Sequence, residues 1–465
     1  MPSSRPQIHE HTVIEQAGES LTAPLAARLN EACQCIWVDR AKLRAQLYAN
    51  LGDAGSLLES QAGLVSGSVV FLAPGEAAAM DRTARLITRA LTSGPYQEKI
   101  ERYAPALARR PQATAGGVLG FDFHLGGPTP QLIEINTNPG GLLVSLELAR
   151  AATASCDCFA EPISVMIAAG VEIDQLGQRI TDGFLAEWAS ARNLLPLRSI
   201  AIVDDEPQDQ YLYPEFLLYQ RLLECAGWRV VIADAASLSL QDGAVFSADE
   251  RIDLIYNRVT DFYLADERHS VLRRAYERNL AVITPHPAAH ARWADKRLLA
   301  WLGDEELLQE AGLGAEDRSH LRQTIPATEV VESAAADDLW KRRKGLFFKP
   351  VDGFGSKAAY RGDKLTRTTF DHILAHHYVA QAIAPTSFRR VSSADGVEAD
   401  LRVDVRNYVM HGETWLRAAR LYRGQTTNFR TAAGGFAPVL TLPSNAIPLY
   451  ATPASCDLPN RSGST

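Results

Sequence analysis

Glu134 and Asn136 are the residues whose types and spacing most clearly indicate chemistry. They lie two positions apart in the otherwise apolar run 132–136, so a β-strand would place both side chains on one face. A carboxylate and a carboxamide oxygen suit Mg2+, which completes its octahedron with phosphate oxygens and water. The Pro-Gly-Gly at 139–141 would end the strand and let backbone approach a ligand closely. An ordinary strand end followed by a turn fits the same residues equally well.

A second pattern combines lysines with glycines much later in the chain. The apolar segment 345–349 ends in Lys349, and the loop that follows contains Asp352, Gly353, Gly355, Ser356 and Lys357. Glycines expose amide N–H groups and lysines supply positive charge, so a hairpin tip of this composition suits phosphates. It is not a Walker loop, which would read Gly-x4-Gly-Lys-Ser/Thr and lead into a helix. A solvated hairpin with a basic rim is the competing interpretation.

Arginines form a third pattern. Arg402 and Asp404 alternate in the segment 399–408, and Arg417 and Arg420 lie in the next one, 414–422, before a polar loop at 425–435. Such arginines are usually surface charge, but a guanidinium in a dry cleft can also steady a transferring phosphoryl group. Neither Gly-x-Ser-x-Gly nor His-Glu-x-x-His occurs in the chain, which removes two common hydrolase motifs.

The elements that must position these residues fall into three regions and a tail. Residues 1–195 are predicted to be mainly helical, with a β-hairpin formed by 117–123 and 131–136. Residues 196–285 alternate short apolar strands with amphipathic helices, which predicts a small parallel sheet whose strand ends commonly bind ligands. Residues 286–442 contain a predicted helix at 291–302 and strands at 345–349, 378–383, 399–408 and 414–422. The segment 443–465 is predicted to be a flexible tail.

Composition excludes several classes of protein. The 465 residues carry a formal charge of -8, with 46% hydrophobic and 22% charged residues. The acidic balance argues against nucleic-acid binding. The polar start and the lack of long apolar runs predict a cytoplasmic protein without membrane spans. The pairs Cys33/Cys35 and Cys156/Cys158 are spaced too closely for usual zinc sites.

Taken together, the three patterns resemble the ATP-grasp superfamily, whose members clamp ATP between two α+β subdomains and join a carboxylate to an amine. Glu134 comes 215 residues before Lys349, whereas most of the superfamily has the Glu-x-Asn strand after the glycine loop. This order resembles the permuted arrangement of eukaryotic-type glutathione synthetases, with a weaker likeness to glutathionylspermidine synthetases, over about 117–439. The resemblance implies an α+β and α/β protein: a circularly permuted ATP-grasp core with an inserted Rossmann-like parallel-sheet substrate domain.

The resemblance also implies a role for individual residues. The implied Mg2+ ligands are Asp122, Glu134 and Asn136, with Asp352 as the acidic ligand beside the glycine loop. Lys296 and Lys349 would contact the ATP phosphates under a lid of Gly353, Gly355 and Ser356, with Lys357 nearby. Gln381 and Ile383 lie where the adenine hinge is expected. Arg402 and Arg420 would face the reacting carboxylate or γ-phosphate, assisted by Asn428.

The chain departs from the synthetases at recognisable positions. They have an arginine two residues before the first metal aspartate, where this chain has Gly120, and a triple-glycine lid, where this chain has Gly353-Phe354-Gly355. The implied activity is an ADP-forming ligase that joins small carboxylate and amine substrates, of the amino acid or short peptide class, through an acyl phosphate. The alternatives are a non-catalytic ATP-binding sensor or scaffold that kept the fold, and a chain whose working part is the Rossmann-like region. A homodimer is compatible with either of the first two.

Overall fold

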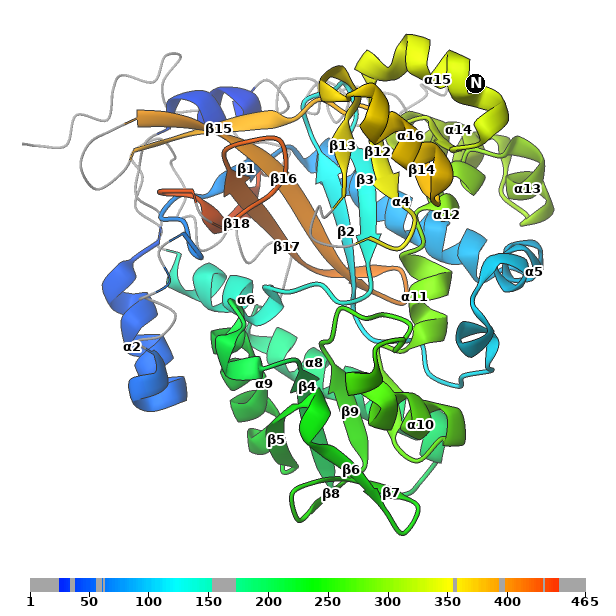
Figure 1. Cartoon of the computed structure of the whole chain (residues 1–465). Coiled ribbons are helices and arrows are strands. Elements are labelled where there is room, and N and C mark those ends of the chain that lie inside the picture. Colours follow the sequence, from blue (N-terminus) through cyan, green and yellow to red (C-terminus); the bar gives the residue numbers. More distant parts are fainter. Residues whose placement is uncertain are drawn as a thin grey trace, which may run out of the picture.

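The computed structural model describes residues 25–33, 38–55, 61, 63–152, 173–353, 358–392, 398–429 and 431–442. The described residues form four sheets with helices packed around them (Figure 1). Several predicted features lie outside these residues, namely Gly355, Ser356 and Lys357, Cys35, the Cys156/Cys158 pair and the tail from 443.

A sheet built from both ends of the chain lies at the middle of the molecule (Figure 1). Its order is β1-β18-β17-β16-β2-β3, with β15 also paired to β16. The antiparallel pairing of β2 with β3 confirms the predicted hairpin, and β2 in turn pairs with β16. Segments 1–195 and 286–442 therefore share one sheet. The strands are β1 (Val70–Leu72), β2 (Leu119–His124), β3 (Gln131–Asn136), β15 (Ser387–Ser392), β16 (Glu398–Met410), β17 (Glu413–Tyr422) and β18 (Gly435–Thr441).

Side-chain alternation gives this sheet one apolar face and one face that carries charge. Leu401, Val403 and Val405 point into a core that also holds Met80 and Ile87 of helix α4. Because successive side chains of a strand point to opposite faces, the residues between them lie on the other face. The helices near this sheet are α2 (Arg40–Leu51), α4 (Pro74–Leu91), α5 (Gly94–Tyr103), α6 (Leu142–Ala151) and α8 (Ile173–Arg192).

The predicted parallel sheet is present in the middle region. Its order is β10-β9-β4-β5, and all three neighbouring pairs are parallel. Its strands and helices are β4 (Ser199–Asp204), α9 (Tyr213–Cys225), β5 (Arg229–Asp234), β9 (Leu254–Asn257), α10 (Ser270–Arg278) and β10 (Val282–Thr284). The antiparallel strands β6 (Leu238–Gln241), β7 (Ala244–Ser247) and β8 (Glu250–Ile252) precede β9 and were not predicted. Helices α8 and α9 share a core with one face of the parallel sheet, and α10 shares a core with the other.

The third region carries a smaller sheet at the upper right of Figure 1. Its order is β11-β14-β12-β13, with β12 paired antiparallel to both β13 and β14. Phe348 of β12 and Phe370 of α16 are fully buried in its core. The elements are α11 (Pro287–Trp293), α12 (Arg297–Trp301), α13 (Glu305–Glu310), α14 (Ala315–Thr324), β11 (Thr328–Val330), α15 (Ala336–Arg342), β12 (Leu346–Pro350), β13 (Tyr360–Arg361), α16 (Arg367–Ala375) and β14 (Tyr378–Ala382).

The single helix predicted over 291–302 is wrong. The structure has α11 and α12 instead, separated at Ala294–Lys296. The backbone N–H of Lys296 donates to the carbonyl oxygen of Val351 at 3.0 Å, a partner 55 residues away. The break therefore ties the start of α12 to the segment that follows β12, and it brings Lys296 to the same place.

Two further observations bear on the sequence predictions. In the part of the chain that the structure describes, no helix is both long and apolar enough to cross a membrane. Cys33 is buried and Cys225 is exposed, and both are free thiols.

A buried histidine joins two loops at the carboxyl ends of the parallel strands. His269, with a side chain 1% exposed, lies between Asp261 at 2.8 Å and Asp205 at 2.9 Å. Burial lowers the pKa of His269, but the hydrogen bonds and charges of the two carboxylates outweigh it, so the pKa is raised above its ordinary value. A cationic His269 therefore ties the loop after β4 to the loop after β9.

We expect this contact to make stability depend on pH. A raised folded-state pKa means that the charged contact contributes fully below the unfolded value of about 6.5 and is lost as the pH rises through the folded value. Urea unfolding of wild type and His269→Gln should therefore show a stability difference that shrinks between about pH 6 and about pH 9. A difference that stays constant with pH would contradict a charged His269.

Candidate functional site

The carboxylate and amide predicted as a pair share one face of β3. Asp122 of β2 lies directly across from Glu134, and Gly120 lies across from Asn136. The side-chain amide of Asn136 donates to Asp122 Oδ2 at 3.1 Å, while a Glu134 oxygen lies 3.7 Å from Lys296 Nζ. The hairpin thus presents polar side chains from both strands on a single face.

Lys349 connects the smaller sheet to this hairpin. Its Nζ donates to the carbonyl oxygen of Ile133 at 2.8 Å and to Gln381 Oε1 at 2.7 Å. Burial lowers the pKa of the ammonium to about 8, with Lys296 lowering it further and Glu134 and Asp122 opposing the shift. Glu134 and Lys349, 215 residues apart in sequence, therefore lie close enough for their charges to interact, as the sequence interpretation required.

Lys296 reaches the same place from the break between α11 and α12. Its Nζ donates to the carbonyl oxygen of Gly353 at 2.6 Å and faces Glu134. A Cβ at Gly353 would lie 2.3 Å from Cγ of Pro350, so only glycine fits there without displacement. Two lysines, one carboxylate and the backbone after β12 thus converge.

A pocket of about 190 Å3 lies at this convergence. It is lined by Glu134, Ile135, Asn136, Thr137, Asn138, Thr260, Phe262, His290, Ala294, Lys296 and Gly353. The sequence gave no reason to single out His290, a residue of α11. Its ring stacks on Phe262 at 3.9 Å between centroids, and burial followed by the charge of Lys296 lowers its pKa to about 3. The pocket therefore has a charged end and an aromatic end whose imidazole is neutral.

A group of buried charges lies beside the pocket, on the charged face of the central sheet. Arg406 grips Asp122 with two nitrogens, at 2.6 Å and 2.7 Å. Arg420 bridges Asp122 at 2.8 Å and Asp404 at 2.5 Å. Burial alone would raise the pKa of the Asp122 carboxyl, but the two arginines outweigh it and lower that pKa well below its usual range. Two carboxylates and two guanidiniums thus cancel in charge.

Buried side chains of the middle region hold the loop that follows Asn136. Glu215 of α9 accepts from the backbone N–H groups of Gly141 at 2.8 Å and Leu143 at 3.1 Å, which satisfies the start of α6. Asn138 donates to the carbonyl oxygen of Arg258 at 2.8 Å. The end of β3 is therefore fixed from the parallel-sheet side as well.

The residues present fit part of a magnesium site. Among the described residues, Glu134 makes one ion pair and Asn136 offers a carboxamide oxygen, both suitable ligands for a hard cation. The described residues contain no group of three or more His, Cys, Asp or Glu side chains that could hold a metal ion. Such a donor set suits Mg2+ bound mainly through substrate phosphates, rather than a cage made by the protein alone.

Comparison with known proteins places this geometry in a known fold. No protein-family model and no curated protein sequence matches the chain. A glutathione synthetase-like effector from Globodera pallida, solved in its apo form, matches with a TM-score of 0.52 at 10% identity, over 88% of this chain and 98% of that chain. This chain has a glutathione synthetase-like fold. The predicted ATP-grasp fold class is thereby confirmed, while the permuted order of its parts stays a prediction.

Two other solved structures match more distantly. A putative gamma-glutamylcysteine synthetase from Methylobacillus flagellatus KT has a TM-score of 0.42 at 13% identity and covers 82% of this chain and 89% of its own. The ATP-grasp ligase PsnB, complexed with a minimal precursor, has a TM-score of 0.28 at 15% identity and covers 54% and 92%. Nothing about this chain is inferred from these two scores.

Within the glutathione synthetase-like fold, the predicted adenine hinge is already hydrogen-bonded. The Gln381 side chain holds Lys349 and donates to Thr328 at 3.2 Å. The backbone N–H of Ile383 donates to the carbonyl oxygen of Gly345 at 3.0 Å. Reading a base with this N–H would require the bond to Gly345 to be exchanged.

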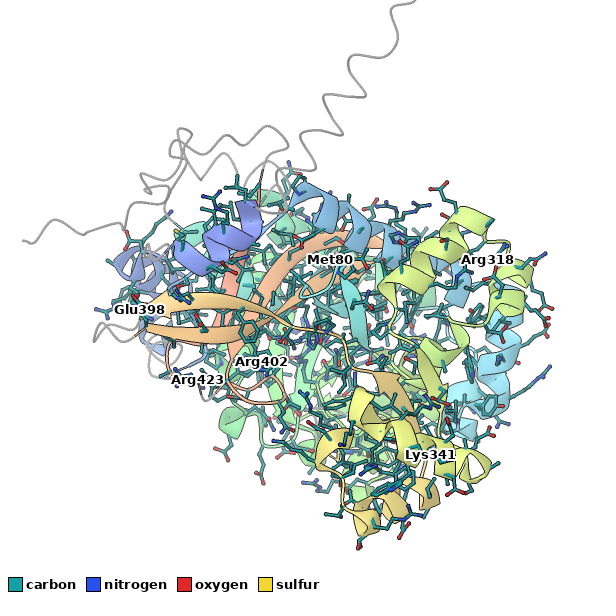
Figure 2. The ribbon with its side chains drawn as sticks, turned by 90° about the horizontal axis from the view of Figure 1, so that it is seen from above. Met80, Arg318, Lys341, Glu398, Arg402 and Arg423 are labelled. Carbon is teal, nitrogen blue, oxygen red and sulfur yellow. The ribbon has the colours of Figure 1, made fainter. Side chains whose placement is uncertain are left out.

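Three predicted site residues have their interactions elsewhere. Arg402 donates to Thr386 at 2.8 Å and lies over the Phe388 ring, and Figure 2 shows it with Glu398, well away in that view from Lys341 of α15. Asn428 donates to the carbonyl oxygen of Arg423 within its own loop. Asp352 is exposed, and its charge acts on Tyr263 and Arg297. The arginine that joins Arg420 at Asp122 is Arg406, which the sequence analysis did not name.

Removing one charge from the buried group should be costly. Arg420→Met leaves Asp404 and Asp122 short of a partner, so we expect a loss of about 3–5 kcal/mol in the free energy of unfolding. Denaturant unfolding measures it. The control is Arg390→Met, since Arg390 pairs with Asp400 at 2.9 Å in a similar geometry but is exposed, and its loss should be barely measurable. Equal losses in the two variants would contradict the importance of burial.

Proposed function

We propose that the protein is an ATP- and Mg2+-dependent, ADP-forming ligase that joins a carboxylate to an amine. The observation that carries the proposal is the convergence of Glu134, Lys296 and Lys349, from three distant segments, on one pocket of a glutathione synthetase-like fold. Two ammonium groups beside a carboxylate suit a triphosphate with its cation. The substrates we propose are small carboxylates and amines of the amino acid or short peptide class.

In the proposed reaction, Lys296 and Lys349 offset the charge of the ATP phosphates. Each is held by backbone carbonyl or amide oxygens, namely those of Gly353, Ile133 and Gln381, so the ammonium groups are oriented before a ligand arrives. Glu134 and the Asn136 oxygen would hold Mg2+, which when bound supplies further neutralisation and alignment of phosphate oxygens. Fixed charge of this kind is most effective in a site from which water is excluded.

The chemistry divides into two displacements. A carboxylate oxygen attacks the γ-phosphorus and ADP leaves, which gives an acyl phosphate. The amine nitrogen then attacks the acyl carbon, phosphate leaves, and the amine loses a proton as the amide forms. Arg420, on the charged face of the central sheet, remains the proposed arginine for the reacting carboxylate. Arg402 is not needed, because its guanidinium is bound to Thr386.

Variants of the convergent residues test the proposal. Glu134→Ala and Lys349→Ala should each lower phosphate release that depends on added carboxylate and amine by about 100-fold or more, because each removes fixed charge at the phosphates. The assay is phosphate release against a panel of amino acids, dipeptides and polyamines. Lys341→Ala is the matched control, since Lys341 is exposed on α15, and its activity should equal wild type.

Two outcomes would contradict the assignment. Full activity in Glu134→Ala or Lys349→Ala would remove these residues from the site. ATP binding without phosphate release across the whole panel would favour the non-catalytic sensor.

A further inference from the structure

Asp122 is surrounded by hydrogen-bond donors, although the resemblance makes it a cation ligand. The carboxylate is 3% exposed. Its Oδ1 accepts from Arg406 Nε, and its Oδ2 accepts from Arg406 Nη2, Arg420 Nη2 and Asn136 Nδ2. Three of the four donors converge on one oxygen, which leaves it no lone pair for an ion.

The charge around Asp122 points the same way. Both guanidiniums lie within 3 Å of its oxygens, at 2.6, 2.7 and 2.8 Å. A divalent cation bound to the same carboxylate would face two positive groups at short range, with their repulsion little screened in a buried site. Glu134 carries no such burden, since its one ion pair among the described residues is with Lys296.

What Asp122 does determine is the orientation of the Asn136 amide. An ionised carboxylate only accepts hydrogen bonds, so the group that Asn136 turns toward it must be the NH2 and not the oxygen. The carboxamide is planar, and its Oδ1 therefore points away from Asp122. Asn136 lines the pocket beside Glu134, so a fixed amide makes its oxygen available there.

We propose that Asp122 is a positioning residue rather than a cation ligand: held by Arg406 and Arg420, it fixes the Asn136 amide so that the carboxamide oxygen, together with Glu134, receives the divalent cation. The inference rests on the proposed function, because it concerns the cation that accompanies ATP. It assigns the direct contact to two residues and the orientation to a third.

Gly120 makes this arrangement possible. A Cβ at position 120 would lie 2.7 Å from Cβ of Pro139 and 3.1 Å from Nε of Arg406. The synthetases have an arginine at this position, whereas here the guanidinium comes from the neighbouring strand β16 and occupies the space that glycine leaves. The departure at Gly120 and the presence of Arg406 are therefore one structural change.

A double-mutant cycle separates positioning from ligation. The probe is Mn2+ in the presence of a non-hydrolysable ATP analogue, with free Mn2+ measured by electron paramagnetic resonance. In Asp122→Asn the new NH2 would face Asn136 and draw its oxygen away from the pocket, so Mn2+ affinity should fall by about 10–100-fold. In an Asn136→Ala background the same substitution should have almost no effect, because no amide remains to be oriented.

Controls and alternative outcomes make the test decisive. Should Asp122→Asn fail to fold, Arg406→Lys takes its place, since it keeps the charge but loses the two-pronged contact, and it should show a smaller loss with the same dependence on Asn136. Arg417→Lys is the matched control, because Arg417 pairs with Asp81 of α4 instead, and it should change nothing. Equal losses in both backgrounds would show that Asp122 binds the ion directly and would overturn the proposal.

The same experiment distinguishes failure of the proposed function. Wild-type protein that binds no Mn2+ with the nucleotide would refute the ligase assignment and this inference with it. Binding that is abolished by Glu134→Ala, but weakened additively by Asp122→Asn and Asn136→Ala, would leave the function intact and refute the positioning role alone.

Discussion

Charge cancellation on one face of the central sheet is the constraint on which the site depends. Asp122 and Asp404 could not be buried as ions without Arg406 and Arg420, because an unpaired buried charge is very costly. The four residues come from β2, β16 and β17, so the group also fixes how the early hairpin lies against the late strands. Glu134 and Asn136 inherit their positions from that register.

Much of this could be read from local pattern. The hairpin over 117–136 was predictable because apolar residues alternate on both sides of a turn-rich stretch, and the parallel sheet because short buried strands alternate with amphipathic helices. The approach of Lys349 to Glu134 was predictable for another reason: few arrangements other than a shared anionic ligand site account for both motifs in one chain. These are cases in which local preference and tertiary structure agree.

The rest depended on partners that are distant in sequence. The helix over 291–302 breaks because the Lys296 N–H finds Val351, and no helix propensity contains that information. Arg402 and Arg406 lie on the same face of β16, so alternation made both candidates, and only the register with Asp122 selects Arg406. β1 and β18 were missed because a short buried strand has no signature apart from its neighbour. The pocket residue His290 gave no signal, since a lone histidine in a helix is usually structural.

The pairing of β1 with β18 has a consequence for how the chain is made. Val70 pairs with Val439, so during synthesis the first strand of the central sheet must wait for nearly all of the polypeptide to leave the ribosome. Contacts this far apart close slowly, and an early strand without its neighbours is open to wrong pairing. The middle region, whose parallel sheet uses only residues 199–284, has no such delay. It can form first and serve as the platform on which the two ends later assemble.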